Sequence, residues 1–408
     1  MKKKFSNSLI MYFIAIFLGI LSGISDISFL QTFGLLIADI FIKVFKCISL
    51  PIIALSLIVT LSSYSKEGTK QNIWQRTLFY TLTTTLIAAC ISCILYLFIN
   101  PANINLNTQN TFASKHTNLS YSEHIIHLIP ANIFAPFLEH QVISVLLVGI
   151  VIGIAIRYIQ DDAARTTISH FFKGAHGLFL VITTWIVKII PLALFGFITA
   201  TLVQLRQGMD IKGIGEYLLI IVLANLLQGF VILPLWLKIN HIKPFETMRG
   251  MLPALSIAFF SKSSAGTLPV TMETAEKNLK IHPRISRFVL PLCTSINMNG
   301  CAAFIFITVI YLMQNHGIEI TLSTMASWII IATIAAIGNA GVPMGCFFLS
   351  ASLLASMNVP ITLLGIILPF YSIIDMVETA LNVWSDACVA KVVNEKTMAD
   401  QENLELTA

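Results

Sequence analysis

Long segments without a charged side chain recur along the chain, separated by polar connections. Four of them, Phe5–Ser25, Thr77–Leu97, Tyr217–Leu237 and Phe288–His316, contain no Asp, Glu, Lys or Arg. Each reaches the roughly 20 residues that an α-helix needs to cross a bilayer. None alternates with period two, so the pattern predicts helices and argues against a β-barrel. The chain is therefore predicted to be an all-α integral membrane protein.

Composition agrees with a membrane location. Of 408 residues, 56% are hydrophobic and 11% are charged, whereas about 25% of residues are charged in a typical soluble domain. The net charge of +5 is ordinary for a membrane protein because cytoplasmic loops are rich in Lys and Arg. We therefore predict the lipid bilayer as a partner and no nucleic acid.

The seven cysteines lie in or beside apolar segments, and their spacing matches no metal-ligand motif. We expect them to be small core side chains, with neither a disulfide framework nor a zinc site. The N-terminal MKKK precedes an apolar segment that is long and lacks a small-residue cleavage site. That segment is expected to stay as the first membrane helix and not to act as a signal peptide.

Positive charge orients the predicted spans. The first six are expected at residues 8–25, 30–62 (interrupted by Pro51), 73–99, 125–157, 175–204 and 213–237. With MKKK inside the cell, the basic connections at 66–76, 157–173 and 238–249 fall in the cytoplasm. The connections left outside carry only Lys115, Arg206 and Lys212. This asymmetry follows the positive-inside rule and predicts a cytoplasmic N-terminus.

Two later segments are too interrupted to be simple spans. Residues 245–277 are broken by Lys262, Gly266 and Pro269 and have cationic residues on both flanks, so both ends belong on the cytoplasmic side. Residues 322–356 are broken by GNAGVPMG within a stretch, 320–374, that has no charged residue, so both of its ends belong outside. Two opposed re-entrant hairpins are typical of an inverted-repeat transporter. Each is followed by a predicted span with a polar motif, helix 7 at 285–313 and helix 8 at 360–393.

The helix at 360–393 is the most polar of the predicted spans. Its side chains Asp375, Glu378, Thr379, Asn382 and Asp386 follow one another at steps that place most of them on one face. Acids at bilayer depth are expected to face the bundle interior or a wet cavity and to mark a substrate or ion path. The alternative is a surface helix, which would hardly follow the uncharged residues 320–374.

The motifs SKSSAGTLPVT, INMNG, GNAGVP and DMVETALNVWSD occur in this order. With them the chain resembles the dicarboxylate/amino acid:cation symporter family, the bacterial and archaeal relatives of glutamate transporters. The resemblance implies eight transmembrane helices, two opposed hairpins, a homotrimer and a transport domain that moves past a fixed scaffold, as in an elevator. Residues 1–244 would then be mainly scaffold, with helices 3 and 6 packing on the transport core at 245–393. Residues 394–408 would form a polar cytoplasmic tail.

The same resemblance implies a substrate site and sodium sites. Substrate would contact the serine-rich first hairpin, the second hairpin as extracellular gate, and the last helix: Ser263, Ser264, Gly341, Val342, Pro343, Asp375, Glu378, Thr379 and Asn382. A first sodium would bind Asn297, Asn382 and Asp386. A second, built largely from carbonyls, would bind Ser295, Ala336, Ile337 and Asn339. A third site would involve Tyr80, Thr83, Thr84 and Asn299. Oxygen ligands suit sodium, a hard cation.

Two residues depart from the acidic-substrate members of that family. Glu378 stands where they carry an arginine, which argues against a dicarboxylate because the bidentate fork is missing. ETALN with a nearby Asp is instead similar to the serine/threonine:sodium symporter branch. Asn299 stands where they carry Asp, which removes a negative charge and weakens the case for a full set of sodium ions.

The sequence thus predicts a secondary transporter of the bacterial inner membrane that imports a small neutral polar amino acid, such as serine or threonine, with sodium. A cationic amino acid bound by Glu378 and an acidic one held by Lys262 stay as alternatives, as does proton coupling. An ion channel is the alternative of another class, disfavoured by the opposed hairpins. No enzyme is predicted, because no HExxH or GxSxG motif occurs.

Overall fold

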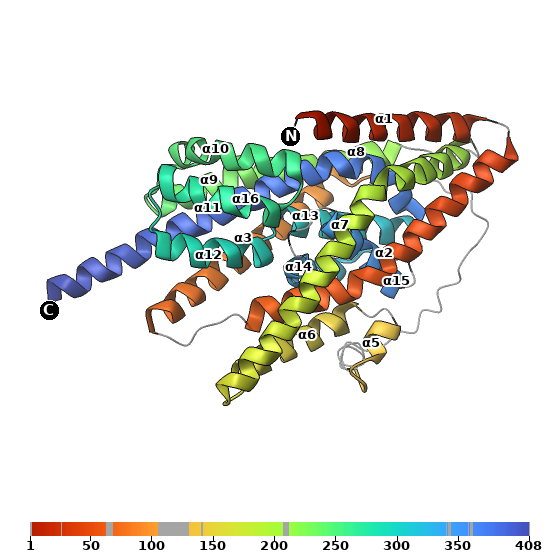
Figure 1. Ribbon diagram of the computed structural model, residues 1–408. Helices are drawn as coiled ribbons and strands as arrows, with labels where there is room; N and C mark the ends of the chain where they lie inside the picture. Colours follow the sequence, from red (N-terminus) through yellow and green to blue (C-terminus); the bar gives the residue numbers. More distant parts are fainter. Residues whose placement is uncertain are drawn as a thin grey trace.

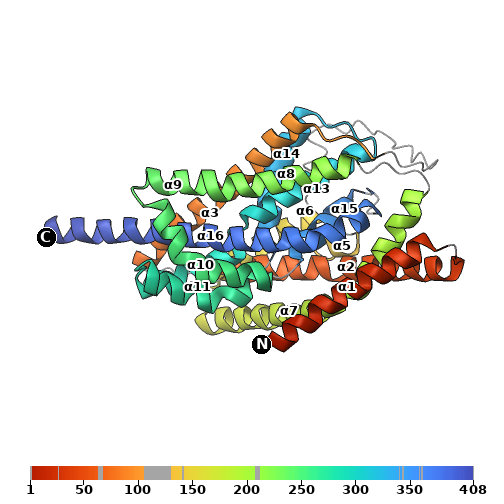
Figure 2. The same cartoon turned by 90° about the horizontal axis from the view of Figure 1, so that it is seen from above.

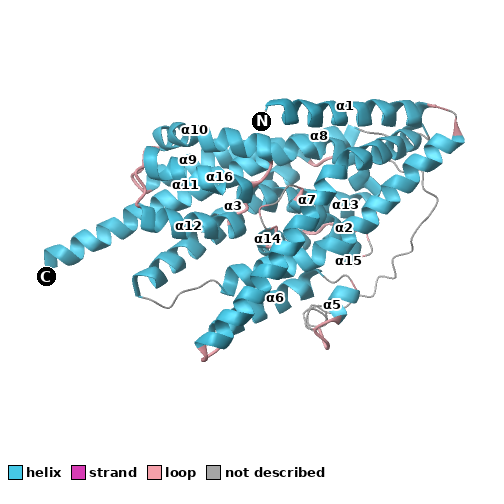
Figure 3. Ribbon diagram, viewed as in Figure 1, coloured by secondary structure: helices cyan, strands magenta, loops and turns pink. Residues whose placement is uncertain are grey.

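A computed structural model describes residues 2–25, 27–62, 68–104, 130–139, 142–206, 212–339, 341, 344–357, 359 and 362–407. Throughout this part of the chain the secondary structure is helical (Figure 3), which confirms the predicted all-α class. The first half contains α1 (Lys2–Ile24), α2 (Ser28–Ser62), α3 (Gly68–Ile99), α5 (Ala135–Leu138), α6 (Val142–Arg157), α7 (Asp162–Arg206) and α8 (Lys212–Leu227). The second half contains the π-helical segment η1 (Gln228–Ile232), then α9 (Leu233–Ile239), α10 (Pro244–Ser261), α11 (Ser264–Asn278), α12 (Pro283–Ile296), α13 (Asn299–Asn315), α14 (Leu322–Ile337), α15 (Gly345–Ser356) and α16 (Thr362–Thr407).

Among the described residues, three helical stretches are long and apolar enough to cross a membrane: Asn72–Ile99, Gly213–Ile239 and Pro283–Asn315. Shorter apolar helices lie at Ile14–Ile24, Ser28–Phe41, Leu50–Ser62, Ser144–Arg157, Pro191–Ala200, Leu322–Ile337 and Gly345–Leu354. The apolar helices therefore lie where the hydrophobic pattern places them.

Several boundaries differ from the predictions. Helix α2 continues through Pro51, since packed neighbours can satisfy the backbone groups that a proline releases in an apolar helix. Helix α7 begins at Asp162, inside the predicted loop 157–173. The segment predicted as one span at 125–157 contains α5 and α6, and its first residues, 125–129, lie outside the described part.

The last helix extends beyond its predicted end at residue 393, because α16 continues to Thr407. Residues 394–407 lack Gly and Pro and are rich in Glu, Lys, Ala, Met and Leu, which are strong helix formers. An ion pair of 2.8 Å between Arg76 and Asp400 joins this extension to α3. In both views the end of α16 projects beyond the other helices (Figures 1 and 2).

The segment expected as a continuous helix at 285–313 is broken. Asn297 and Met298 have non-helical dihedral angles, with ψ of 70° and 65°, and they separate α12 from α13. Every residue of α13 from Asn299 to Met313 is buried. A polar, non-helical backbone at this depth requires protein on all sides, and α13 has it from α3, α8, α14, α15 and α16.

A second irregularity lies in the span predicted at 213–237. Helix α8 passes through the five-residue π-helical segment η1 into α9. Pro234, at the start of α9, lacks an amide hydrogen, and its ring would clash with the carbonyl four residues earlier. A wider π-turn accommodates it, and such π-segments are frequent at functional sites.

Two helical hairpins, α10–α11 and α14–α15, meet at their tips. The amide of Ala265, just after the first tip, donates to the carbonyl of Gly341 in the second tip (3.3 Å). Helix α16 packs against α10, α11, α12 and α13 and runs through the middle of this group (Figure 2). A second group of helices that pack on one another consists of α1, α2, α6 and α7 (Figure 1). Helix α2 of this group also contacts α15 of the second hairpin.

Candidate substrate and cation site

The first hairpin turns at a serine that begins α11. The Ser263 hydroxyl accepts a hydrogen bond from the amide of Gly266 (3.0 Å) and donates to the carbonyl of Gly341 (3.3 Å). This cap leaves other amides of the first turn free of intrahelical partners, and the N-terminus of a helix favours an anion. Ser264, the first residue of α11, is buried.

Gly341 brings the second hairpin close to the first. Its φ of +62° lies in the left-handed region that favours glycine. A Cβ at this position would come within 2.8 Å of the Thr294 carbonyl. Glycine is therefore required for the tip to approach both the first hairpin and α12. Val342 and Pro343, also predicted in this gate, lie outside the described residues.

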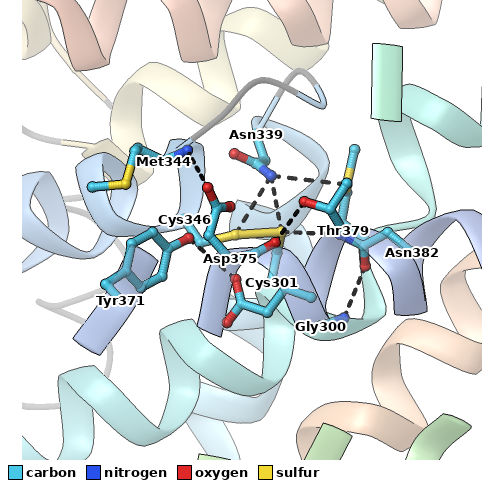
Figure 4. Close-up of a disulfide and its surroundings, with 11 residues drawn as sticks. Gly300, Cys301, Asn339, Met344, Cys346, Tyr371, Asp375, Thr379 and Asn382 are labelled. Carbon is cyan, nitrogen blue, oxygen red and sulfur yellow. Dashed lines mark hydrogen bonds between the residues drawn. A yellow bond between two sulfur atoms is a disulfide. The ribbon is translucent and has the colours of Figure 1, made fainter. Parts of the chain in front are cut away.

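Asp375 joins the second hairpin to α16. Its Oδ2 accepts a hydrogen bond from the amide of Met344 (3.1 Å), and its side chain is buried (Figure 4). One turn further, the Thr379 hydroxyl donates to the carbonyl of Asp375 (2.7 Å). The carboxylate thus lies beside the hairpin tip, where it can hold a cationic group.

Glu378 is 1% exposed, and its two carboxylate oxygens differ in their hydrogen bonding. Its Oε2 accepts a hydrogen bond from the Tyr371 hydroxyl (3.1 Å), whereas its Oε1 has no partner among the described residues. A Cβ on Gly300 would lie 2.9 Å from the Glu378 Cα and 3.1 Å from Oδ1 of Asn225, another buried oxygen that has no partner in the described part of the chain. An unsatisfied buried acceptor costs about 1–3 kcal/mol, so a ligand that donates hydrogen bonds would be stabilised here.

Asp386 is the third buried acid of α16. Its Oδ1 accepts a hydrogen bond from the Asn297 amide (3.0 Å) and its Oδ2 one from the Thr294 hydroxyl (3.5 Å). No ion pair of the described part involves it. Removing a charge from water is costly unless it is paired. A bound cation would supply that pairing.

Asn382 lies between these acids. Its Oδ1 accepts a hydrogen bond from the amide of Gly300 (2.9 Å) at the start of α13 (Figure 4). This bond holds the break between α12 and α13 against α16. The predicted first sodium set, Asn297, Asn382 and Asp386, is thus linked by short contacts around the break.

The predicted second sodium set falls at two helix C-termini. Helix α12 ends at Ile296 and α14 ends at Ile337, and the two helices are in contact. Ser295, Ala336 and Ile337 lie in these last turns, and buried Asn339 follows. Carbonyl groups at helix C-termini carry partial negative charge and favour cations.

Only part of the predicted third sodium set comes together. The Thr84 hydroxyl lies 2.9 Å from the Tyr80 carbonyl of its own helix and 3.1 Å from Oδ1 of Asn297. The Thr83 hydroxyl donates to the Phe79 carbonyl of the same helix (2.7 Å), and the Tyr80 ring packs on Trp236. The Asn299 amide donates to Ser385, and its Oδ1 has no partner in the described part.

Two amide side chains of the α8–η1 segment, Gln228 and Asn225, were not predicted as site residues. The Gln228 amide donates to the Thr84 carbonyl (3.1 Å), and its Oε1 has no partner among the described residues. Asn225, one turn earlier, faces Gly300. Both lie in the uncharged run Tyr217–Leu237, where a buried amide is as informative as the acids of α16.

The prediction that no disulfide forms is wrong. Cys301 and Cys346 are joined by a disulfide, with Cα atoms 5.4 Å apart (Figure 4). One oxygen of Glu378 lies within 4.8 Å of both sulfur atoms. The two cysteines are 45 residues apart on α13 and α15, so their spacing gave no indication of the pairing. Cys47, Cys90, Cys93, Cys293 and Cys388 are free.

Comparison of the sequence with known proteins shows the family of this chain. The model of the sodium:dicarboxylate symporter family matches residues 9–396. A putative sodium-dependent excitatory amino acid transporter, glt-4 of Caenorhabditis elegans, is 25% identical over 89% of this chain and 82% of its own. Neutral amino acid transporter A of Bos taurus is 26% identical over 73% of this chain and 57% of its own. Neutral amino acid transporter B(0) of Homo sapiens is 24% identical over 86% of this chain and 71% of its own. The chain belongs to the sodium:dicarboxylate symporter family.

Proposed function

We propose that this protein is a sodium-coupled symporter that imports a small neutral polar amino acid such as serine or threonine. Its relatives include proteins named as neutral amino acid transporters and one named as a putative sodium-dependent excitatory amino acid transporter. The observation that carries the substrate class is Glu378, a buried carboxylate one turn from Asp375, with one oxygen that has no partner among the residues the structure describes. A second carboxylate repels acidic side chains and accepts from a hydroxyl.

The three parts of an amino acid match three parts of the site. The substrate carboxylate binds the amides and hydroxyls at the start of α11, at Ser263 and Ser264. Its ammonium binds Asp375, and its side chain binds Glu378 and Thr379. Asn382 and Gly341, with Val342 and Pro343, complete the enclosure. Each assignment pairs opposite charge or donor with acceptor, and the charges at the two ends of the site suit a zwitterion.

Sodium is proposed at the first and second sites. Asp386, with Asn297 and Asn382, supplies oxygen ligands and the negative charge that a buried cation needs. Ser295, Ala336, Ile337 and Asn339 supply the C-terminal carbonyls of the second site. A third ion at Tyr80, Thr83, Thr84 and Asn299 has weaker support, since Thr83 is bonded to its own helix and Asn299 is uncharged.

Alternating access is proposed to follow the division into scaffold (1–244) and transport core (245–393), with α3 and the α8–α9 segment packing on the core. The hairpins re-enter the membrane from opposite sides, and the second is the extracellular gate. Eight spans, a homotrimer in the bacterial inner membrane and cytoplasmic termini complete this proposal. Exposed apolar side chains such as Phe17, Phe29 and Leu36 support burial of α1 and α2 in lipid or between subunits.

A cationic substrate is the second candidate, because Glu378 could bind an ammonium directly. The acidic candidate has less support: Lys262, the cation near the first tip, already donates to Ser372 of α16 (2.5 Å), and a flexible ammonium replaces an arginine fork poorly. Proton coupling is the alternative to sodium.

Counterflow in proteoliposomes tests the proposal. Vesicles loaded with unlabelled serine should accumulate labelled serine in the presence of sodium, whereas a channel would only dissipate the gradient. A thermal-shift screen of all amino acids, with and without sodium, then ranks the substrates, since a ligand of the folded state raises its stability. Counterflow by arginine or aspartate in place of serine would overturn the substrate class and leave symport intact.

A further inference from the structure

The cysteine pair lies where the gate hairpin contacts the central helix. Cys301 is in the first turn of α13, and Cys346 is in the first turn of α15, directly after the hairpin tip. Their Cα separation of 5.4 Å is within the range that a disulfide requires. Oxidation at this site therefore connects two elements that the proposed gating motion must separate.

The surroundings of the pair belong to the candidate site. The Asn339 amide approaches the sulfur of Cys301 (2.8 Å) and that of Cys346 (3.5 Å), and the Asn382 amide approaches Cys301 (3.5 Å) (Figure 4). Met344, whose amide donates to Asp375, lies two residues before Cys346 in the sequence. The sulfur atoms thus lie between the residues assigned to substrate and those assigned to the first and second sodium ions.

We infer that Cys301 and Cys346 form a thiol-modification site, specific for small-molecule disulfides, and that closing their disulfide fixes the second hairpin on α13 and stops transport. In the reaction, one cysteine thiolate attacks the small disulfide, forming a mixed disulfide and releasing one thiol. The second cysteine thiolate then attacks the protein sulfur of the mixed disulfide and releases the second thiol. The two cysteine thiols lose two electrons and two protons, and the small disulfide is reduced.

The weak bonds of the tip explain why a covalent link matters. The two helices of the hairpin pack on α2, α3, α6 and α13. In the described part of the tip, hydrogen bonds run from Ser263 and Ala265 to Gly341 and from Met344 to Asp375. Such bonds each contribute little net free energy, more where a charge takes part, and thermal motion breaks them. A disulfide does not open on the time scale of transport. Both cysteines are buried, so the small disulfide reaches them only when the hairpin moves away, and ligands that hold the hairpin closed should protect them.

The test uses the full-length protein in proteoliposomes, treated with oxidised glutathione and then mapped by mass spectrometry without reduction. The wild type should yield a peptide pair joined through Cys301 and Cys346. Its sodium-dependent uptake should fall to the level of protein-free vesicles and return with dithiothreitol. Cys346→Ser and Cys301→Ala should keep whatever uptake each has before oxidation. The double variant Cys90→Ala/Cys93→Ala is the matched control, since it removes two neighbouring free cysteines of α3 and should remain sensitive.

A second readout does not depend on the substrate. Amide hydrogen exchange over residues 338–357 should become slower on oxidation of the wild type and stay unchanged in Cys346→Ser. The inference is overturned if no Cys301–Cys346 peptide forms, if the peptide forms while exchange and uptake are unaffected, or if oxidation acts equally on Cys346→Ser. A wrong substrate assignment would abolish uptake before oxidation but leave the peptide map and the exchange result to decide.

Discussion

Replacing Glu378 with arginine tests how the site selects its substrate. In the wild type this carboxylate accepts one hydrogen bond from Tyr371, and its other oxygen has no partner within the described ranges. Arginine turns the acceptor into a planar set of donors that matches a carboxylate bidentately. We expect the wild type to take serine or threonine and ignore aspartate. Glu378→Arg should gain aspartate binding and lose the hydroxy amino acids.

The size of the change can be estimated from the contacts. Two charge-assisted hydrogen bonds of about 1.5–3 kcal/mol each favour a desolvated carboxylate by about 3–6 kcal/mol. Arginine is larger than glutamate, and the Cα of Glu378 already lies against Gly300, so overpacking should cost about 1–3 kcal/mol. At the middle of each range the balance is about 2.5 kcal/mol, which corresponds to a gain in aspartate affinity of about 60-fold, at 1.4 kcal/mol per factor of ten.

Thermal shift with sodium present measures this gain, using aspartate and serine on the wild type, Glu378→Arg and the control Glu378→Gln. Glutamine keeps the shape of the side chain without a charge, so it should retain some serine binding and gain far less affinity for aspartate than arginine does. Wild-type uptake of labelled aspartate at low concentration, without competition from serine, threonine or alanine, would refute the reasoning.

Three further substitutions address the cations and the substrate ammonium. Asp386→Ala removes the charge bonded by Asn297 and should lower sodium affinity at least about tenfold, for a charged hydrogen-bonding group worth about 1.5–3 kcal/mol; an unchanged effect of sodium on substrate affinity would contradict this role. Asp375→Asn should abolish substrate binding while sodium still raises the melting temperature, and loss of both in a folded variant would argue against separate roles. Asn299→Asp should add a sodium-dependent component to transport, which an equal charge per substrate in reversal-potential measurements would rule out.

The face of the last helix could be predicted because its signal is local. Asp375, Glu378, Asn382 and Asp386 follow helical spacing within one segment, and all four side chains are buried. A charged group in an apolar run must face protein or water, so their direction needs no knowledge of the neighbours. For Asp375 and Asp386 the partners come from distant parts of the chain, Met344 and Asn297 respectively, whereas Glu378 is bonded by Tyr371 of its own helix.

Non-local geometry explains the two clear failures. Cys301 and Cys346 meet because α13 begins at the Asn297–Met298 break and α15 begins just after the hairpin tip, and no spacing rule connects two such positions. The break itself replaced a predicted continuous helix. Its signal was INMNG, where Asn and Gly are weak helix formers, but the hydrogen bond from Gly300 to Asn382 that supports it comes from another helix.

Asn225 and Gln228 could have been predicted, because the rule that identified the buried acids of α16 also applies to them. An amide in an uncharged run such as Tyr217–Leu237 must find partners inside the protein, and that alone predicts that this face of α8 looks toward other helices. The position of the Asn225 side chain depends on Gly300. Because it has no Cβ, Oδ1 of Asn225 can approach the backbone beside Glu378, while Gln228 reaches the Thr84 carbonyl instead. The two buried amides of the α8–η1 segment therefore lie beside both the proposed substrate side-chain position and the proposed cation positions.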